Sequence, residues 1–283
     1  MMAFPSPAKL NLFLHVLGQR EDGYHTLQTV FQFLDYGDTL HFEQNDGEDI
    51  KLATTIPGVA AQDNLILRAA TLLKPLAQSN TGVTITLDKQ LPIGAGLGGG
   101  SSNAATTLVA LNQLWDCQCS TQQLITLGSQ LGADVPVFIQ GVSAWAEGIG
   151  DKLTPLLALD EPWYCVVFPN CTVSTAAIFS SPYLTRDCKP ITISRFISGE
   201  GRNSLTDCVS RHYPEVSAAL NWLDQYGEAK MTGTGSCVFV RCETAQQAQL
   251  ILAELPKEWS GFVAKGCNTS PLATYQATQW STA

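Results

Sequence analysis

The chain carries a run of eleven residues in which glycine dominates, Pro-Ile-Gly-Ala-Gly-Leu-Gly-Gly-Gly-Ser-Ser from Pro92 to Ser102. Five of the nine residues from 94 to 102 are glycine, so successive backbone N–H groups can point at one anion and approach it closely. Apolar residues then recur at helical spacing through 101–115, which predicts a helix that begins at Ser101 or Ser102. A helix start adds unpaired N–H donors and the positive end of the helix dipole. The pattern therefore predicts a loop that holds phosphate groups.

Other interpretations of this run fit less well. Gly94, Gly96 and Gly99 match the GxGxxG dinucleotide pattern, which leaves a nicotinamide-dependent oxidoreductase as an alternative. Against it, the preceding strand ends about five residues too early, and no strand-terminal acid follows at a spacing of about 20 residues. A Walker A loop needs Gly-Lys-Ser/Thr, and the lysine is missing. A flexible linker is rarely followed at once by a strong helix such as 103–111.

Length and charge narrow the classes of partner. The chain has 283 residues, 45% of them hydrophobic and 14% charged, which provides apolar material for two lobes and argues against disorder. Its formal charge of −9 creates no general field that attracts nucleic acid or an anionic membrane. We therefore expect a small-molecule ligand, with no nucleic acid and no membrane as partner, and phosphate bound by local features only.

The cysteines and the first residues indicate the compartment. The nine cysteines are odd in number and include no CxxC pair, so we expect no structural zinc site. The first residues lack the basic and apolar regions of a signal peptide, and no run of 18 apolar residues occurs. These features predict a reduced, cytoplasmic protein with free, mostly buried thiols.

Hydrophobic periodicity predicts a mixed order of strands and helices. Strands are expected at 7–16, 26–35, 38–44, 50–55, 83–92, 143–147, 163–168, 237–242 and 261–267. Helices are expected at 64–73, 101–115, 121–132, 174–180, 213–226 and 244–255. Because the strands come in runs rather than in strict alternation with helices, we expect an α+β fold. Prolines and polar residues cluster near 150–162, which predicts two lobes, 1–155 and 156–283.

Two charged residues are ambiguous from the residues alone. The strand at 7–16 alternates and is expected to be half-buried, with Leu10 on one face and Lys9 and Asn11 on the other. A lysine in that position is most often simply exposed. Asp134 follows a helix expected to end near Gly132, where a lone aspartate is normally a turn residue or a cap.

Three segments together resemble the GHMP kinase superfamily. They are PAKLNLFLHVLGQREDGYH at 7–25, the glycine run, and MTGTGSCVFV at 231–240, in the superfamily's order and along nearly the whole chain. The resemblance implies two lobes with the active site in the cleft between them, and a loop that wraps the phosphates of ATP. Leu10 stands where the superfamily more often has isoleucine, and Gln19 where it often has arginine. Neither departure changes the expectation.

The resemblance also implies a substrate and two catalytic residues. The DGYH segment at 22–25 is similar to superfamily members that phosphorylate the 2-hydroxyl of a cytidine diphosphate-linked methylerythritol, in non-mevalonate isoprenoid precursor synthesis. GADVPVF at 132–138 matches the segment that supplies the catalytic aspartate, so Asp134 is the expected general base. Lys9 would stabilise the ionised aspartate and the polarised acceptor oxygen. Asn11 shares the face of Lys9 and would hydrogen-bond substrate.

Binding residues follow from the same resemblance. His25 would recognise the cytosine, Tyr24 would shape its pocket, and Phe179 would stack on the base. Residues expected to bind ATP are Pro92, Ile93, Gly94, Ala95, Gly96, Leu97, Gly98, Gly99, Gly100, Ser101 and Ser102, with Asn64, Leu65 and Lys89 at the adenine. The small-residue loop from Thr232 to Ser236 is either a plain turn or a substrate contact.

The sequence alone assigns no metal ligand and leaves several rival functions. Phosphoryl transfer from ATP calls for Mg²⁺, which prefers oxygen ligands. Ser101, Ser102 and Glu147 are possible ligands, but none is assigned. The rivals are another GHMP kinase acting on mevalonate, homoserine or a sugar, the nicotinamide enzyme, and a binding module without catalysis. The expected oligomeric state is monomer or homodimer.

Overall fold

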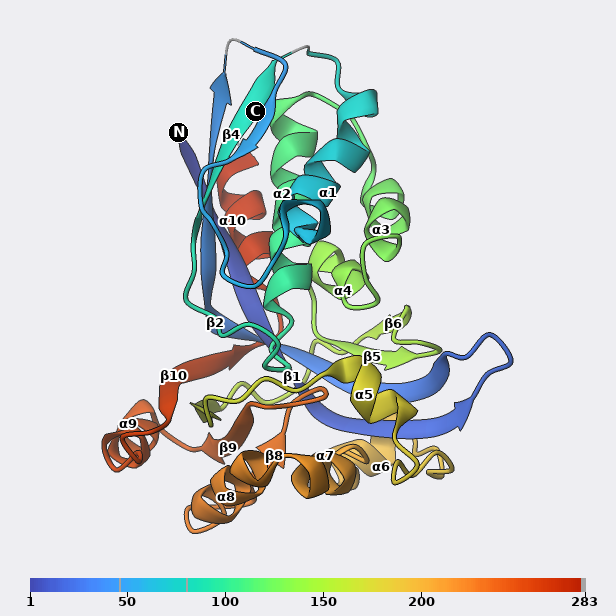
Figure 1. Ribbon diagram of the computed structural model, residues 1–283, viewed down its shortest axis with the longest axis vertical. Helices are drawn as coiled ribbons and strands as arrows, with labels where there is room; N and C mark the ends of the chain where they lie inside the picture. Colours follow the sequence, from blue (N-terminus) through green and yellow to red (C-terminus); the bar gives the residue numbers. More distant parts are fainter. Residues whose placement is uncertain (46, 80, 281–283) are drawn as a thin grey trace.

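The computed structural model describes residues 1–45, 47–79 and 81–280, whose strands form one ten-stranded sheet (Figure 1). The strands are β1 (Met2–Gln19), β2 (His25–Asn45), β3 (Ile50–Leu52), β4 (Gly82–Asp88), β5 (Ala144–Glu147), β6 (Lys152–Pro155), β7 (Trp163–Phe168), β8 (Lys230–Met231), β9 (Val238–Cys242) and β10 (Ser260–Cys267). The hydrogen-bonded path runs β3-β4-β2-β10-β7-β9-β8, while β1 and the β5-β6 hairpin also join β2. All of these strand pairs are antiparallel except β3 with β4.

The helices gather at two ends of the sheet. They are α1 (Leu65–Leu73), α2 (Gly99–Leu114), α3 (Thr121–Ser129), α4 (Val135–Gln140), α5 (Thr175–Ser180), α6 (Ile193–Ile197), α7 (Thr206–His212), α8 (Pro214–Leu223), α9 (Ala245–Ala253) and α10 (Pro271–Trp280), with short 3₁₀ turns at Ala61–Asp63 and Lys74–Leu76. Figure 1 shows α1 to α4 and α10 beside β1, β2 and β4, and α5 to α9 at the other end. The α+β class expected from the sequence is confirmed. None of the described helices combines the length and hydropathy needed to cross a membrane.

Strand β1 takes part in both large hydrophobic cores. Phe4 packs in the core that holds α2, whereas Leu14 packs in the core that holds α7 and α8. The chain end returns to the first of these cores, since the Tyr275 ring of α10 lies 5.0 Å from the Phe4 ring, centroid to centroid. Part of the segment 156–283 thus packs beside the N-terminal elements. The lobe boundary between 155 and 156 stays a prediction.

Several element limits differ from those expected. The strands predicted at 26–35 and 38–44 are one continuous strand, β2. Strand β4 ends at Asp88 rather than at 92, because the next backbone N–H groups donate to a buried aspartate. Helix α2 begins at Gly99, two residues before Ser101, because Gly98 adopts a left-handed conformation that starts the helical turn. The last two glycines of the run therefore form the first turn of α2.

The prediction that the strand at 7–16 is half-buried is wrong. Lys9, Asn11 and Phe13 are all at most 3% exposed, although they alternate with the apolar face. The glycine run covers this second face, since the Lys9 backbone N–H donates to the Leu97 carbonyl at 3.0 Å. Bulges between Pro7 and Lys9 and between Asn11 and Phe13 also break the simple alternation.

The start of α3 offers a test of local stability. Ser120 is the N-cap: its hydroxyl accepts from the Gln123 N–H, and the Gln123 side chain accepts from the Ser120 N–H. We expect Ser120→Ala to lower the free energy of unfolding by about 1 kcal/mol. Urea titration measures this loss, with Ser129→Ala at the other end of α3 as the control. Equal effects of the two substitutions would contradict the capping role.

Candidate active site

The glycine run forms a wall between two cavities. One, here called the small cavity, has a volume of about 330 Å³ and is lined by the run together with Asn64, Leu65 and Lys89. The other, here called the cleft, has a volume of about 500 Å³ and is lined by residues of β1, β2, α5 and the loop at 232–236. Gly94, Gly96, Gly98 and Ser101 line both cavities. A group bound on the run can therefore be reached from either side.

Two apolar residues of the run anchor it to the protein core, whereas its glycines have no side chain to cover the backbone. Ala95 and Leu97 are buried in a cluster with Ala8 and Leu10 of β1. Gly96 between them has φ of +78°, and a Cβ there would lie 2.1 Å from the Thr232 carbonyl oxygen. A side chain at this position would therefore separate the run from the loop at 232–236.

The loop at 232–236 is tied to both the run and β1. The Thr232 hydroxyl donates to the Gly96 carbonyl at 3.1 Å and accepts from the Asn11 N–H at 3.0 Å. Asn203 holds the loop from the other side, because its Nδ2 donates to the Met231 and Gly233 carbonyls. Gly233 and Thr234 line the cleft, so the loop is more than a plain turn. Asn203 carried no signal in the sequence.

Lys9 and Asp134 meet in the cleft. Lys9 Nζ lies 3.3 Å from Asp134 Oδ2, and their side chains are 3% and 32% exposed. The buried ammonium also donates to Asn11 Oδ1 and to the Gly96 carbonyl, and lies 5.4 Å from the centroid of the Phe31 ring. The structure therefore brings together the lysine, asparagine and aspartate predicted from the sequence, at the edge of the glycine run. Asp134 is the N-cap of α4, a helix that the sequence did not indicate.

The aromatic residues predicted for the base lie along the same cleft. The His25 and Phe179 rings are 4.9 Å apart between centroids, and both residues line the cleft with Tyr24. Tyr24 is 61% exposed at the rim, whereas His25 is buried. Burial and the nearby Arg186 guanidinium lower the pKa of His25 below its ordinary value. The imidazole is thus neutral near pH 7, with one ring nitrogen as donor and one as acceptor.

A buried aspartate positions the start of the glycine run. Both Asp38 oxygens are saturated: Oδ1 accepts from the N–H groups of Gln90 and Leu91, and Oδ2 from Lys89 Nζ and Asn103 Nδ2. The carboxylate therefore joins the end of β4 to the first turns of α2. The ammonium of Lys89 is held 2.7 Å from Asp38, beside the small cavity. Neither Asp38 nor Asn103 was identified from the sequence.

Ser102 and Glu147 lie away from both cavities, whereas Asn64 lines one of them. Ser102 is fully buried, and its hydroxyl accepts a hydrogen bond from Ser6 at 2.9 Å, so the structure brings it to neither cavity. Asn64 lines the small cavity while its Oδ1 caps α1 by accepting from the Ile66 N–H. Glu147 accepts from Gln28 Nε2 and is not among the residues that line the cavities.

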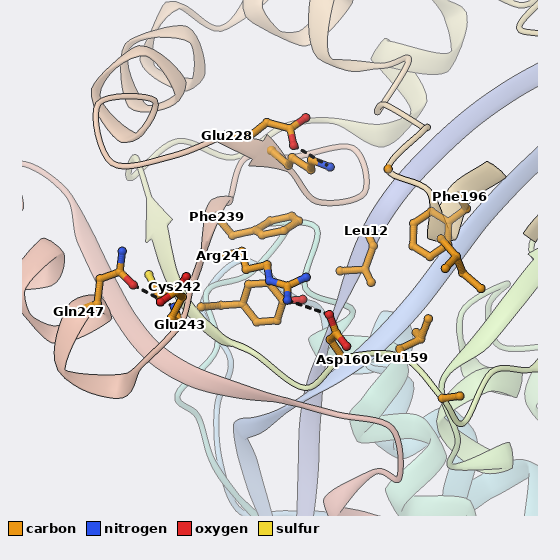
Figure 2. A pocket seen from close by; sticks show the side chains of 15 residues that line it. Leu12, Leu159, Asp160, Phe196, Glu228, Phe239, Arg241, Cys242, Glu243 and Gln247 are labelled. Atoms are coloured by element: carbon orange, nitrogen blue, oxygen red, sulfur yellow. Dashed lines mark hydrogen bonds and ion pairs between the residues drawn. The ribbon is translucent and has the colours of Figure 1, made fainter. Parts of the chain in front are cut away.

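A third cavity of about 600 Å³ lies on the opposite face of β1 (Figure 2). Leu12 points into it, whereas its neighbour Asn11 lines the cleft. Arg241 is paired with Asp160 at 2.8 Å, and Lys230 with Glu228 at 3.2 Å, so both cations of this cavity are already engaged. No residue of the glycine run lines it. It is therefore separate from the site formed by Lys9 and Asp134.

The cysteines take no part in this site. All nine are free, and five of them are buried, as the sequence predicted. Burial raises the pKa of the Cys117 thiol to about 11 and that of Cys165 to about 12, so both stay protonated and unreactive near neutral pH. Among the described residues, no cluster of three or more histidine, cysteine, aspartate or glutamate side chains could hold a metal ion.

Comparison with protein families gives the class of this fold and site. The model of the GHMP kinases N terminal domain matches residues 64–142, and that of the GHMP kinases C terminal domain matches residues 190–261. Together the two models match more than half of the chain. The chain belongs to the GHMP kinases, which confirms the resemblance seen in the sequence.

Relatives place the chain more narrowly. The 4-diphosphocytidyl-2-C-methyl-D-erythritol kinase of Nitrosococcus oceani is 53% identical over 96% of this chain and 97% of the relative, and that of Pseudomonas aeruginosa is 52% identical over 96% of both. A crystal structure of 4-(cytidine 5'-diphospho)-2C-methyl-D-erythritol kinase has a TM-score of 0.82 at 33% identity, over 94% of this chain and 99% of the other. Within the GHMP kinases, the chain is thus a member of the 4-diphosphocytidyl-2-C-methyl-D-erythritol kinase family. A mevalonate kinase at 15% identity, with a TM-score of 0.68 over 95% of this chain, shares the fold.

Proposed function

We propose that this protein transfers the γ-phosphoryl group of ATP to the 2-hydroxyl of 4-diphosphocytidyl-2-C-methyl-D-erythritol, giving the 2-phosphate and ADP. The reaction belongs to the non-mevalonate synthesis of isoprenoid precursors. The observation that carries the proposal is the position of the Lys9–Asp134 pair in the cleft, next to a glycine run that also lines a second cavity. Donor and acceptor can thus meet across the run from opposite sides.

The chain's own residues account for the transfer. Adenosine occupies the small cavity near Asn64 and Leu65, and the phosphates lie on the N–H groups of the run and the start of α2. Asp134 accepts the proton of the acceptor hydroxyl, whose oxygen bonds to the γ-phosphorus as the bond to the β–γ bridging oxygen breaks. ADP leaves with that oxygen. Lys9 stabilises the negative charge on the acceptor oxygen. General-base catalysis by a residue such as Asp134 contributes about 10²–10⁴-fold in rate.

The cytidine end of the substrate lies between aromatic residues. His25 and Phe179 bring two rings to one side of the cleft, and Tyr24 adds a third at its rim. A flat pyrimidine gains from stacking on such rings, and the neutral imidazole offers the donor that a base edge requires. We infer that this end of the cleft discriminates the cytidyl substrate from mevalonate or homoserine, which have no base.

A magnesium ion fits this site as a companion of ATP. Mg²⁺ is usually bound by one or two protein oxygens, several waters and substrate phosphates, so the absence of a carboxylate cluster in the described chain is no obstacle. Ser101 lines both cavities. Its hydroxyl oxygen lies beside the loop leading to Asp134, since a Cβ placed on Gly132 would be 3.6 Å from it. We infer that Ser101 supplies a protein oxygen. When bound, the ion neutralises charge that develops on the phosphates.

An acidic protein can bind these anionic ligands because the attraction is local. The bare N–H groups of the run, the dipole of α2 and the ammonium of Lys9 act within the site, while the overall charge is −9. The cytoplasmic location and the choice between monomer and homodimer stay predictions from the sequence.

The substrate is tested by a direct competition of acceptors. Purified protein with ATP and Mg²⁺ is expected to release ADP with 4-diphosphocytidyl-2-C-methyl-D-erythritol, and to release little with mevalonate or homoserine. The 2-phosphate is identified by phosphorus NMR. Turnover of mevalonate or homoserine without turnover of the cytidyl compound would reject the proposal. Stabilisation against heat by NAD but not by ATP would favour the nicotinamide alternative instead.

A further inference from the structure

Arg186 lies behind the two residues that face the base end of the cleft. It follows α5 in the chain and is partly buried. Its Nη2 donates to the carbonyls of Phe179 and Ser181 at 2.7 and 3.0 Å, and its Nη1 donates to the Leu184 carbonyl at 3.2 Å. Its Nε donates to His25 Nε2 at 3.0 Å. One planar guanidinium thus connects the end of α5 to the start of β2.

These bonds fix two positions that are distant in the sequence. Phe179 belongs to α5, and its carbonyl is among those that a helix end leaves without an internal partner. His25 begins β2, immediately after the turn at residues 20–24. A cation at a helix C-terminus is favourable, and the fork of the guanidinium holds both segments in one geometry.

We propose that Arg186 is the positioning residue that sets the orientation and the tautomer of His25 for recognition of the cytosine base. This inference rests on the proposed function, because it takes the His25 end of the cleft as the site of the base. Because Nε2 accepts from Arg186, the proton of the neutral ring is on Nδ1. Within the described chain Nδ1 has no hydrogen-bond partner, so it is the donor for a carbonyl or ring-nitrogen acceptor of the pyrimidine.

The charge of Arg186 acts in the same direction as the geometry. Burial and this guanidinium both lower the pKa of His25, which keeps the accepting Nε2 unprotonated at neutral pH. Among the charged groups of neighbouring segments, Arg20 pairs with Asp22 in the turn at 2.8 Å and Glu147 of β5 accepts from Gln28. Asp187, next to Arg186 in the chain, is exposed. Arg186 is the charge that makes a hydrogen bond to the ring.

The experiment compares Arg186→Gln, Arg186→Lys and the parent enzyme in KM, kcat and their pH dependence. We expect Arg186→Gln to raise the KM for the cytidyl substrate about tenfold, with kcat and the KM for ATP nearly unchanged. The acid limb of kcat/KM should move to higher pH, because loss of the cation lets His25 take a proton sooner. Arg186→Lys keeps the charge but not the fork, so it should raise KM while leaving the acid limb near that of the parent.

The controls separate a positioning role from a structural one. Arg195→Gln removes the exposed ion pair with Glu200 and should change none of these values. In a His25→Ala background, Arg186→Gln should raise KM much less than in the parent, since residues that act together are not additive. Additive effects, or an unmoved acid limb in Arg186→Gln, would overturn the inference. If the parent enzyme does not phosphorylate the cytidyl compound, the proposed function fails instead. Should Arg186→Gln not fold, the KM effect of Arg186→Lys is compared in the parent and in the His25→Ala background, and additive effects would again overturn the inference.

Discussion

Replacing Asp134 by asparagine is expected to lower kcat by about 10²–10⁴-fold while leaving the affinity for ATP nearly unchanged. The amide has the size of the carboxylate but cannot accept the proton of the acceptor hydroxyl. It also removes the anion that lies 3.3 Å from Lys9 Nζ. The Asp134 side chain is 32% exposed and makes no cap bond to α4, so the substitution has little reason to unfold the protein. The effect should therefore fall on the chemical step.

Single-turnover rates measure this step without interference from product release. The thermal shift caused by ATP with Mg²⁺ reports nucleotide binding and should be kept in Asp134→Asn. Asp116→Asn is a matched control, because Asp116 is exposed after α2 and has a positive φ that asparagine also tolerates. If Asp134→Asn turned over at the rate of this control, the aspartate would have no part in proton transfer.

Local patterns in the sequence predicted the elements that carry the phosphates. The glycine run and the apolar spacing after it led to the loop and to α2, because both depend on neighbouring residues. Lys9 and Asn11 were placed on one face by the period of a strand, but their burial was missed. The run that covers them lies far along the chain: Lys9 and Gly96, which share a hydrogen bond, are 87 positions apart. Their chemical roles came from the resemblance rather than from the pattern.

The supporting residues could not be predicted in this way. Asp38, Asn203 and Arg186 each lie in an ordinary polar context, and nothing within a few positions of them signals a role. Arg186 and His25 are 161 positions apart, and Asp38 and Asn103 are 65 apart. Such pairs are formed only when the strands and helices pack. The sequence thus indicated groups at the reaction centre, whereas the groups that hold them emerge from tertiary contacts.

The second large effect is expected at Asp38, whose side chain is fully buried. Asp38→Ala should lower the free energy of unfolding by about 3–5 kcal/mol, because it leaves a lysine ammonium and two backbone N–H groups without their acceptor. The alanine also leaves a small void between β4 and α2. Since these N–H groups belong to Gln90 and Leu91, the start of the glycine run should lose its position, and the KM for ATP should rise.

The urea midpoint at an unchanged slope measures the loss of stability. Asp88→Ala serves as the control, because Asp88 is the exposed last residue of β4 and its carboxylate accepts only from the Gln90 side chain in the described structure. This substitution should change stability by less than about 0.5 kcal/mol. Asp38→Asn keeps one carbonyl oxygen for the backbone N–H groups and loses the charge that faces Lys89, so an intermediate loss of about 1.5–3 kcal/mol is expected. The stability order in which Asp38→Ala is lowest and the parent highest is expected if both the acceptor for the two backbone N–H groups and the charge facing Lys89 contribute. Equal stability of Asp38→Ala and Asp88→Ala would show that the run is anchored without it.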